Sequence, residues 1–100
     1  NVLLGCAAWK DRVNIEDMLF AGAVVSRIGK HISINCDSSH IALTLYENAK
    51  KDLFAFMKKN DASHYHRLMN FGLEKDIRYC LTNDGANILP IYDEGKLVVK

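Results

Sequence analysis

The stretch NVLLGCAAWKDRVNIEDMLFAGAVV, residues 1–25, decides the fold expected for this 100-residue chain. Its first six residues form a continuous apolar run that ends in a glycine and a small residue, which is typical of a buried strand. Asn14 is a suitable helix N-cap, and apolar residues then recur at helical spacing from Ile15 to Ile28. The stretch therefore predicts a strand, a loop and a helix, in that order.

Outward from this stretch, the pattern predicts several more helices and a hairpin. The five residues of ISINC are too few to separate a strand from a loop, whereas ILPIYDEGKLVVK indicates two strands joined at Asp93-Glu94-Gly95. We therefore expect an α/β class: a layered α/β/α-type half-domain with a small mixed sheet, several helices and a C-terminal β-hairpin, with residues 1–100 as a single domain. The further helices are predicted to start at Asp37 or Ser38, at Asp52, at Ser63 and near Leu73.

The overall composition excludes several classes of protein. Hydrophobic residues make up 49% of the chain, which is enough for one globular core, but no apolar run approaches the roughly 18 residues that cross a membrane. The net charge of +1 gives no strong attraction to nucleic acid or to an acidic membrane, so neither is expected as a partner. The three cysteines lack the spacing of a disulfide framework or a zinc ribbon, which favours a cytoplasmic location.

The loop between the predicted strand and helix has the composition of an anion site. A helix N-terminus presents unpaired N–H groups and a partial positive charge, and Lys10 and Arg12 flank the place where a phosphate would bind. Five residues separate Cys6 from Arg12, the spacing of the loop that cysteine phosphatases use. Asp11 inside the loop and Val13 after the arginine are not typical of cysteine phosphatases. Two interpretations of Cys6 therefore stay open, a catalytic nucleophile and a small buried residue.

Two acids in the first turn of the predicted helix, Glu16 and Asp17, raise a second question. They would repel a phosphate dianion unless a divalent cation lay between them, and Mg²⁺ takes one or two carboxylates together with phosphate oxygens and waters. Acids in a first turn also complement the helix dipole in proteins that bind no ligand. The residues alone leave both interpretations open.

Residues 1–25 resemble a motif of the 2-phosphosulfolactate phosphatases, Cys-Ala-Gly-x-x-Gly-x-x-x-x-Glu-Asp followed by a helix of small residues. HYHRLMNFGLEKDIRYCL, and Asp84 followed by ILPIYDEGKLV, resemble later motifs of the family in the same order. The resemblance covers essentially the whole chain, but only the C-terminal half of the family. Ala8 and Asp11 stand where the family has glycines.

The resemblance implies a Mg²⁺-dependent phosphatase that hydrolyses 2-phosphosulfolactate, or a related phosphorylated hydroxy acid, in coenzyme M biosynthesis. It implies an α/β/α fold with the site in a cleft between two halves, completed by the N-terminal half of the same protein, so a fragment alone would be inactive. Glu16, Asp17 and Cys6 are the expected catalytic residues, with Glu16 and Asp17 also holding the metal. Lys10 and Arg12 are the expected substrate-binding residues.

Two alternatives to metal-assisted hydrolysis stay open at this point. One is covalent catalysis by Cys6 with Arg12 on the phosphate, and the other is a non-catalytic interaction module. A chain of this length has a modest stability margin, which is also compatible with a homo-oligomer. Trp9 is expected either to cover the ligand or to pack against the absent half, with packing favoured. The histidines are assigned to the surface or to packing because they lack zinc spacing: His31, His40, His64 and His66.

Overall fold

The computed structural model describes residues 1–99, which form five helices followed by a two-stranded antiparallel hairpin. This mixed architecture confirms the predicted α/β class, with several helices and a hairpin at the end of the chain. Within residues 1–99, no helix has both the length and the apolar character needed to cross a membrane. The elements are α1 (Ile15–Ile28), α2 (Asp37–Ala49), α3 (Leu53–Lys59), α4 (Ser63–Asn70), α5 (Glu74–Cys80), β1 (Pro90–Asp93) and β2 (Lys96–Val99).

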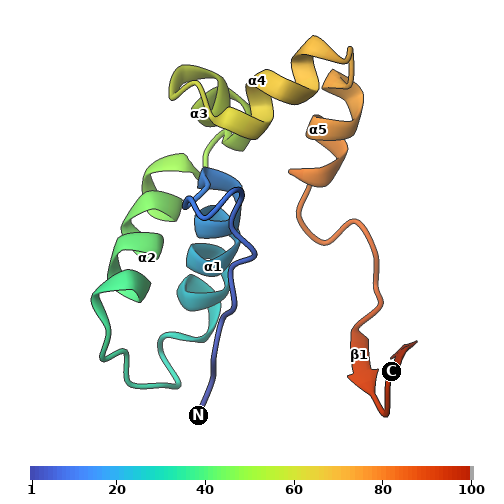
Figure 1. The fold of residues 1–100 in the computed structure, drawn as a ribbon. Coiled ribbons are helices and arrows are strands. Elements are labelled where there is room, and N and C mark those ends of the chain that lie inside the picture. The colour runs from blue at the N-terminus through green and yellow to red at the C-terminus, as the bar shows by residue number, and fades with distance from the viewer. Residues whose placement is uncertain (100) are drawn as a thin grey trace.

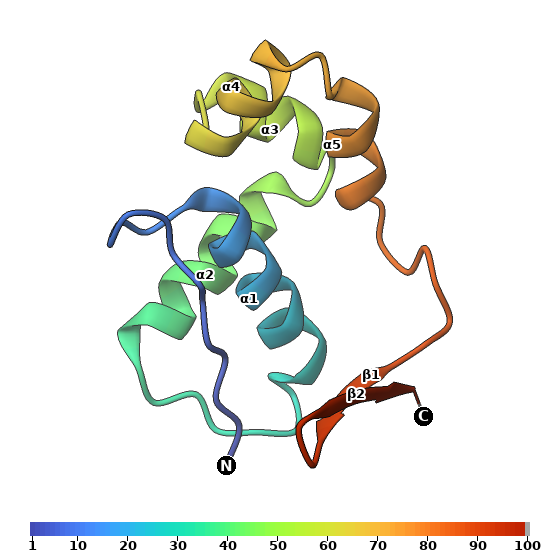
Figure 2. The same cartoon turned by 45° about the vertical axis from the view of Figure 1, so that its right-hand side comes forward.

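The helices form two groups (Figures 1 and 2). Helices α1 and α2 lie side by side and antiparallel, and the shorter α3, α4 and α5 lie across the end where α1 begins and α2 ends. The N-terminal segment runs along α1, and the hairpin lies apart from both groups at the end of a long connection. This arrangement brings the loop before α1 up to the group that contains α4.

The close approach of α1 and α2 depends on a glycine. A Cβ atom at Gly22 would lie 2.1 Å from the carbonyl oxygen of Ala42 and 2.7 Å from Cβ of Tyr46. Only a residue without a side chain allows this backbone contact. The small residues of the AGA segment in the sequence thus serve helix packing.

The hydrophobic core joins the two groups of helices. Its buried members come from α1, from the end of α2, from the connection before α4 and from all three short helices. Each short helix thus gains stability from packing that its length alone could not provide. Burying one side chain of leucine size contributes about 1.5–3 kcal/mol. The buried members are Leu19, Ala49, Met57, Ala62, Tyr65 and Ile77.

Local signals placed most of the helix ends correctly. The Asp52 side chain accepts a hydrogen bond of 2.9 Å from the backbone N–H of Ala55, as expected of an N-cap. Gly72 has the left-handed φ of 71° that was expected after α4. Glu94 and Gly95, with φ of 43° and 81°, form the turn between β1 and β2.

The sheet is smaller than the sequence predicted. NVLLGC and ISINC do not form strands, and among residues 1–99 the hairpin is the only sheet. A strand exists only when a neighbouring strand satisfies its backbone groups, and nothing in the described part of the chain pairs with NVLLGC. Leu3 is left 93% exposed, a degree that an apolar residue in the middle of a buried strand would not show.

Candidate functional site

The loop before α1 is a tight turn that carries charged residues at its tip. The backbone N–H groups of Trp9 and Arg12 each donate to the carbonyl of the other residue at 3.0 Å. The two residues between them, Lys10 and Asp11, have φ of 52° and 58°. This is the pattern of a two-residue hairpin turn, and it fixes where the charged side chains of Lys10, Asp11 and Arg12 leave the backbone.

This loop holds several non-glycine residues in a left-handed conformation. Ala8 has φ of 62°, so with Lys10 and Asp11 three such residues lie within four positions. Each costs about 1–2 kcal/mol relative to an ordinary conformation. Ala8 and Asp11 are the two positions where the family that this sequence resembles has glycine. The positive φ at both positions is the physical reason for a glycine there. Backbone strain of this kind is concentrated at functional sites.

Asp17 fastens the loop to α1. Its carboxylate oxygen Oδ2 accepts a 2.9 Å hydrogen bond from the backbone N–H of Ala8, and its carbonyl accepts a weak contact from Cys6 Sγ at 3.8 Å. Asn14 has the extended backbone of an N-cap, but its side chain makes no capping bond and its Oδ1 is buried without a partner. Asp17 therefore serves the loop rather than the end of the helix.

Glu16, the other acid of this turn, faces helix α4. Its Oε1 contacts Nδ1 of His64, and both side chains are largely buried. Neither Glu16 carboxylate oxygen is paired in a regular hydrogen bond, and His64 Nε2 is also buried without a partner. Glu16 and Asp17 thus follow each other in the sequence but have different partners.

These positions bear on the expected metal. Within residues 1–99, no three His, Cys, Asp or Glu side chains come together as a metal cage. A complete site is not needed, because Mg²⁺ often takes one or two protein carboxylates and fills the remaining positions with water and phosphate oxygens. Glu16 Oε1 contacts His64, Glu16 Oε2 is buried without a hydrogen-bond partner, and Asp17 uses only Oδ2. Glu16 Oε2 and Asp17 Oδ1 are thus the oxygens with which this chain would hold a metal, and the metal itself stays a prediction.

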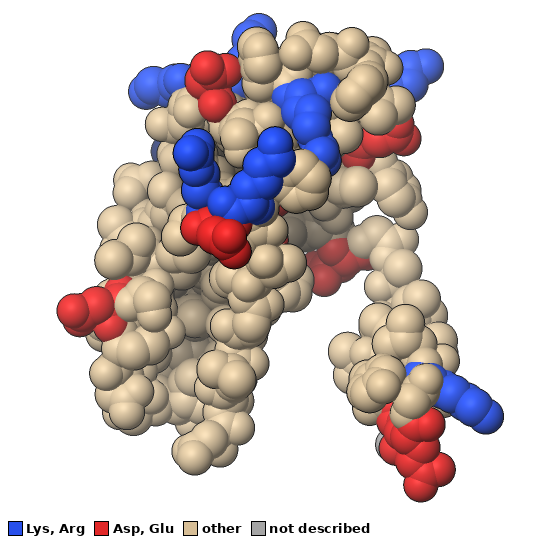
Figure 3. Space-filling model, in the orientation of Figure 1, with Lys and Arg blue, Asp and Glu red and all other residues tan. Residues whose placement is uncertain are grey.

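Helix α4 adds residues that the sequence analysis did not assign to the site. The Trp9 ring packs edge-on against His64, with 5.4 Å between ring centroids, and Arg67 Cζ lies 4.6 Å from the Trp9 centroid. Lys10 Nζ lies 5.8 Å from the same centroid. His64 and Arg67 share a face of α4 because they are three residues apart. Lys and Arg side chains gather on this face of the molecule, where the loop meets the α3–α4 region (Figure 3).

Trp9 therefore packs against this chain's own α4. Trp9 also stays 43% exposed, so its packing against an absent half stays a prediction, while the assignment of His64 to packing agrees with these contacts. The signal available in the sequence was the pair His64 and Arg67 at helical spacing, but nothing local connects that pair to a loop more than fifty residues away.

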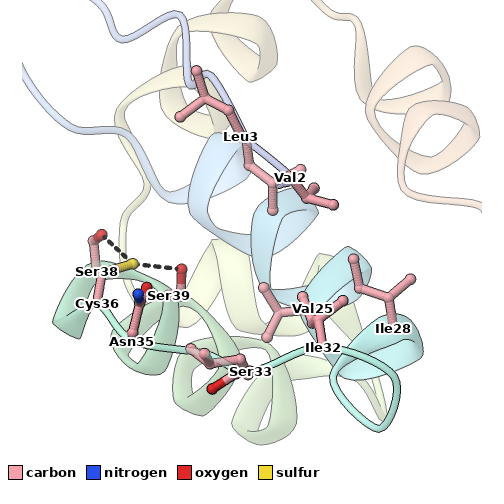
Figure 4. A pocket seen from close by; sticks show the side chains of 12 residues that line it. Val2, Leu3, Val25, Ile28, Ile32, Ser33, Asn35, Cys36, Ser38 and Ser39 are labelled. Atoms are coloured by element: carbon pink, nitrogen blue, oxygen red, sulfur yellow. Dashed lines mark hydrogen bonds between the residues drawn. The ribbon is translucent and has the colours of Figure 1, made fainter.

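A separate hollow lies between the N-terminal segment and the pair α1–α2 (Figure 4). Its lining combines apolar side chains such as Val2, Leu3 and Val25 with polar ones, and Cys36 lies at one end. The Cys36 sulfur lies 2.9 Å from the Ser39 hydroxyl and 3.6 Å from that of Ser38, and these hydrogen bonds lower the pKa of the thiol. None of the charged loop residues lines this hollow, so it is distinct from the loop before α1.

Comparisons with known proteins point to one family. The family profile described as 2-phosphosulpholactate phosphatase matches residues 1–95. A probable 2-phosphosulfolactate phosphatase of Thermotoga maritima is 33% identical over 103 residues, covering 100% of this chain and 42% of the relative. One from a Picosynechococcus species is 34% identical over 90 residues, covering 88% of this chain and 36% of the relative. This chain thus spans less than half the length of these relatives, and no solved structure matches it.

Proposed function

We propose, from the premise that this chain belongs to the 2-phosphosulfolactate phosphatase family, that it forms the phosphate-binding part of a phosphatase. The proposed substrate is 2-phosphosulfolactate or a related phosphorylated hydroxy acid. The observation that carries the proposal is the strained turn at residues 8–12, which presents Lys10 and Arg12 directly before a 14-residue helix. A helix start and adjacent cations together favour a bound phosphate.

In this proposal the loop residues bind and neutralise the ester. Arg12 has a planar guanidinium that can hold two phosphate oxygens at once, and Lys10 adds a second positive charge. Asp17 keeps the loop in its strained shape through its bond to the Ala8 N–H. Asp17 is thus a positioning residue as well as a candidate metal ligand.

We further propose that the phosphatase depends on Mg²⁺. A bound Mg²⁺ would offset the charge of the ester and lower the pKa of a coordinated water. Glu16 and the free oxygen of Asp17 are the residues of this chain that would hold it. Glu16 would offer Oε2, which is buried without a partner, while its Oε1 contacts His64.

The remaining ligands are proposed to come from an N-terminal half. The support is that the relatives are more than twice as long as the stretch this chain matches, and that apolar residues of the N-terminal segment and the hairpin are exposed. A role in coenzyme M biosynthesis and a cytoplasmic location belong to the same proposal.

Covalent catalysis by Cys6 has weaker support. The Cys6 thiol contacts the backbone carbonyl of Asp17, an acceptor that cannot stabilise a thiolate. The residue that it contacts, Asp17, is also the acid whose carboxylate holds the loop. We therefore place Cys6 at the base of the loop and assign the attack on phosphorus to water.

The decisive experiment is a chimera in which this chain replaces the matching segment of the Thermotoga maritima relative. We expect release of phosphate from 2-phosphosulfolactate that requires Mg²⁺, stops with EDTA and survives Cys6→Ser. Activity that is lost with Cys6→Ser while Mg²⁺ dependence is retained would support the covalent route instead. A folded chimera that releases no phosphate from a panel of phosphorylated hydroxy acids would favour the non-catalytic module.

A further inference from the structure

We propose that Arg67, Lys10 and the Trp9 ring form a second anion subsite, which binds the sulfonate of a substrate whose phosphate lies at Arg12. This inference rests on the proposed function and extends it to the choice of substrate. It assigns α4 to substrate recognition and makes Arg67 a specificity-determining residue.

The first support is that one aromatic ring gathers two cations from distant parts of the sequence. Arg67 Cζ and Lys10 Nζ lie 4.6 Å and 5.8 Å from the Trp9 centroid, although 57 residues separate them. Cation–π attraction stabilises each of the two charges at the ring. An anionic group of a ligand bound at this ring would be attracted by both charges.

The second support is that neither cation has an acidic partner within residues 1–99. Elsewhere in the described chain, Arg27 pairs with Asp84, Arg78 with Glu74 and Lys50 with Glu47. Lys10 and Arg67 form no such ion pair. Their charges are therefore available to a ligand in a way that those of the paired residues are not.

The third support is the geometry of the ring contact. A guanidinium that lies over an aromatic face keeps its N–H groups directed outward in the plane, where they can donate to anionic oxygens. The Trp9 ring is itself fixed, by His64 on one side and by the turn that contains Lys10 on the other. Arg67 is thus held in place without using up its donors.

The subsite accounts for selectivity between esters. A phosphate ester with a second, permanently ionised group needs more positive charge than Arg12 and the helix start supply. An ester without that group leaves Arg67 and Lys10 unpaired and gains nothing from them, so the subsite favours the doubly acidic substrate. Asp11 at the tip of the turn opposes this binding, which makes the contribution of Arg67 more important.

Kinetics on the chimera test the inference. We expect Arg67→Leu to lower kcat/KM for 2-phosphosulfolactate by about tenfold or more, and to change kcat/KM for 2-phospholactate, which lacks the sulfonate, by less than about twofold. Arg78→Leu is the matched control, because Arg78 also lies over an aromatic ring but is paired with Glu74. Equal losses on both substrates, or no loss on either, would overturn the subsite.

Fluorescence of this chain gives a second readout that needs no catalysis. Trp9 is the only tryptophan in the sequence, so its emission reports directly on the subsite. We expect 3-sulfolactate to change the emission at lower concentration than lactate, and Arg67→Leu, but not Arg78→Leu, to remove the difference. Phosphatase activity without any preference for the sulfonate would contradict this inference alone. Sulfonate binding without phosphatase activity would contradict only the proposed function.

Discussion

At Ala8 a methyl group sits in a backbone conformation that favours glycine. Its φ of 62° is strained for alanine, and glycine adopts it without steric cost. We expect Ala8→Gly to raise the free energy of unfolding by about 0.5–1 kcal/mol, since the relief of strain exceeds the added freedom of the unfolded chain. Urea unfolding followed by circular dichroism measures this change.

Ala7→Gly is the control for that substitution, because Ala7 is not among the residues with positive φ. It should lower the free energy of unfolding slightly or leave it unchanged. If Ala7→Gly and Ala8→Gly shift the urea midpoint in the same direction, the strain assigned to the loop is not real.

Asp11 is the acid that stands between the two basic residues of the turn. Asparagine has the same shape and tolerates a left-handed φ, so Asp11→Asn removes a negative charge and leaves the turn intact. We expect the chain to bind inorganic phosphate about two- to fivefold more tightly, as the loss of one exposed like charge implies. Titration of the Trp9 emission measures the affinity. Asp93→Asn, in the hairpin, is the control, and an equal gain there would mean that only net charge matters.

At the scale of elements, the contact between α1 and α2 depends on Gly22. An added methyl group would overlap the Ala42 carbonyl, and the two backbones would have to separate. We expect Gly22→Ala to lower the free energy of unfolding by about 1–3 kcal/mol, although alanine favours a helix more than glycine does. Thermal unfolding followed by circular dichroism tests this. Gly5→Ala, which meets no atom within 4 Å, should have little effect, and a stabilised Gly22→Ala would refute the close contact.

The helices and strands also show which parts of this fold can be predicted from the sequence. The helices follow from capping residues and apolar spacing within a few positions of each other, and their ends agree with Asp52 and Gly72. NVLLGC has the composition of a strand, but pairing depends on a partner outside the stretch, and none is present in residues 1–99. Local composition therefore predicted the helices and the hairpin correctly, and the strand at NVLLGC wrongly.

The candidate site also has a part that could be predicted from the sequence and a part that could not. The loop residues from Cys6 to Arg12 and the acids Glu16 and Asp17 are neighbours in the sequence, so their charge pattern was visible there. His64 and Arg67 reach Trp9 only because the helices fold back on each other. The separate partners of Glu16 and Asp17 were also invisible, since adjacent residues in a helix point in different directions.

At the scale of the whole molecule, two segments outside the helical core carry exposed apolar residues. Val2 and Leu3 of the N-terminal segment and Leu97 of the hairpin are 60%, 93% and 77% exposed. Scattered exposed apolar residues are normal and also occur on the helices, as at Phe20 and Ile41. Those of the N-terminal segment and the hairpin differ in lying on segments that the helical core does not cover. The two segments are thus the surfaces of this chain on which further strands could pair and be buried.

The connection from α5 to the hairpin is tied back to α1 by one bidentate ion pair. Arg27 donates to both carboxylate oxygens of Asp84, at 3.2 Å and 2.9 Å, and this hydrogen bonding holds the pKa of Asp84 below its usual range. A carboxyl with a lowered pKa stabilises the folded arrangement above its unfolded value of about 3.9, and that stabilisation is lost as the pH falls through the folded pKa. Because the Arg27 and Asp84 side chains are both exposed, added salt should weaken this ion pair.

We therefore expect the molecule to expand when this pair is broken. The radius of gyration of its Cα atoms is 14.7 Å. X-ray scattering in solution should show this radius constant from pH 7 to pH 5 and larger only once the pH falls through the lowered pKa of Asp84, below the ordinary value of about 3.9. Asp84→Asn, which tolerates the left-handed φ of 54°, should give the larger value already at pH 7 without loss of helix. Asp37→Asn, remote in sequence from the pair, is the control. If Asp84→Asn keeps the radius of the unchanged chain at low salt, contacts other than this ion pair hold the C-terminal segment in place.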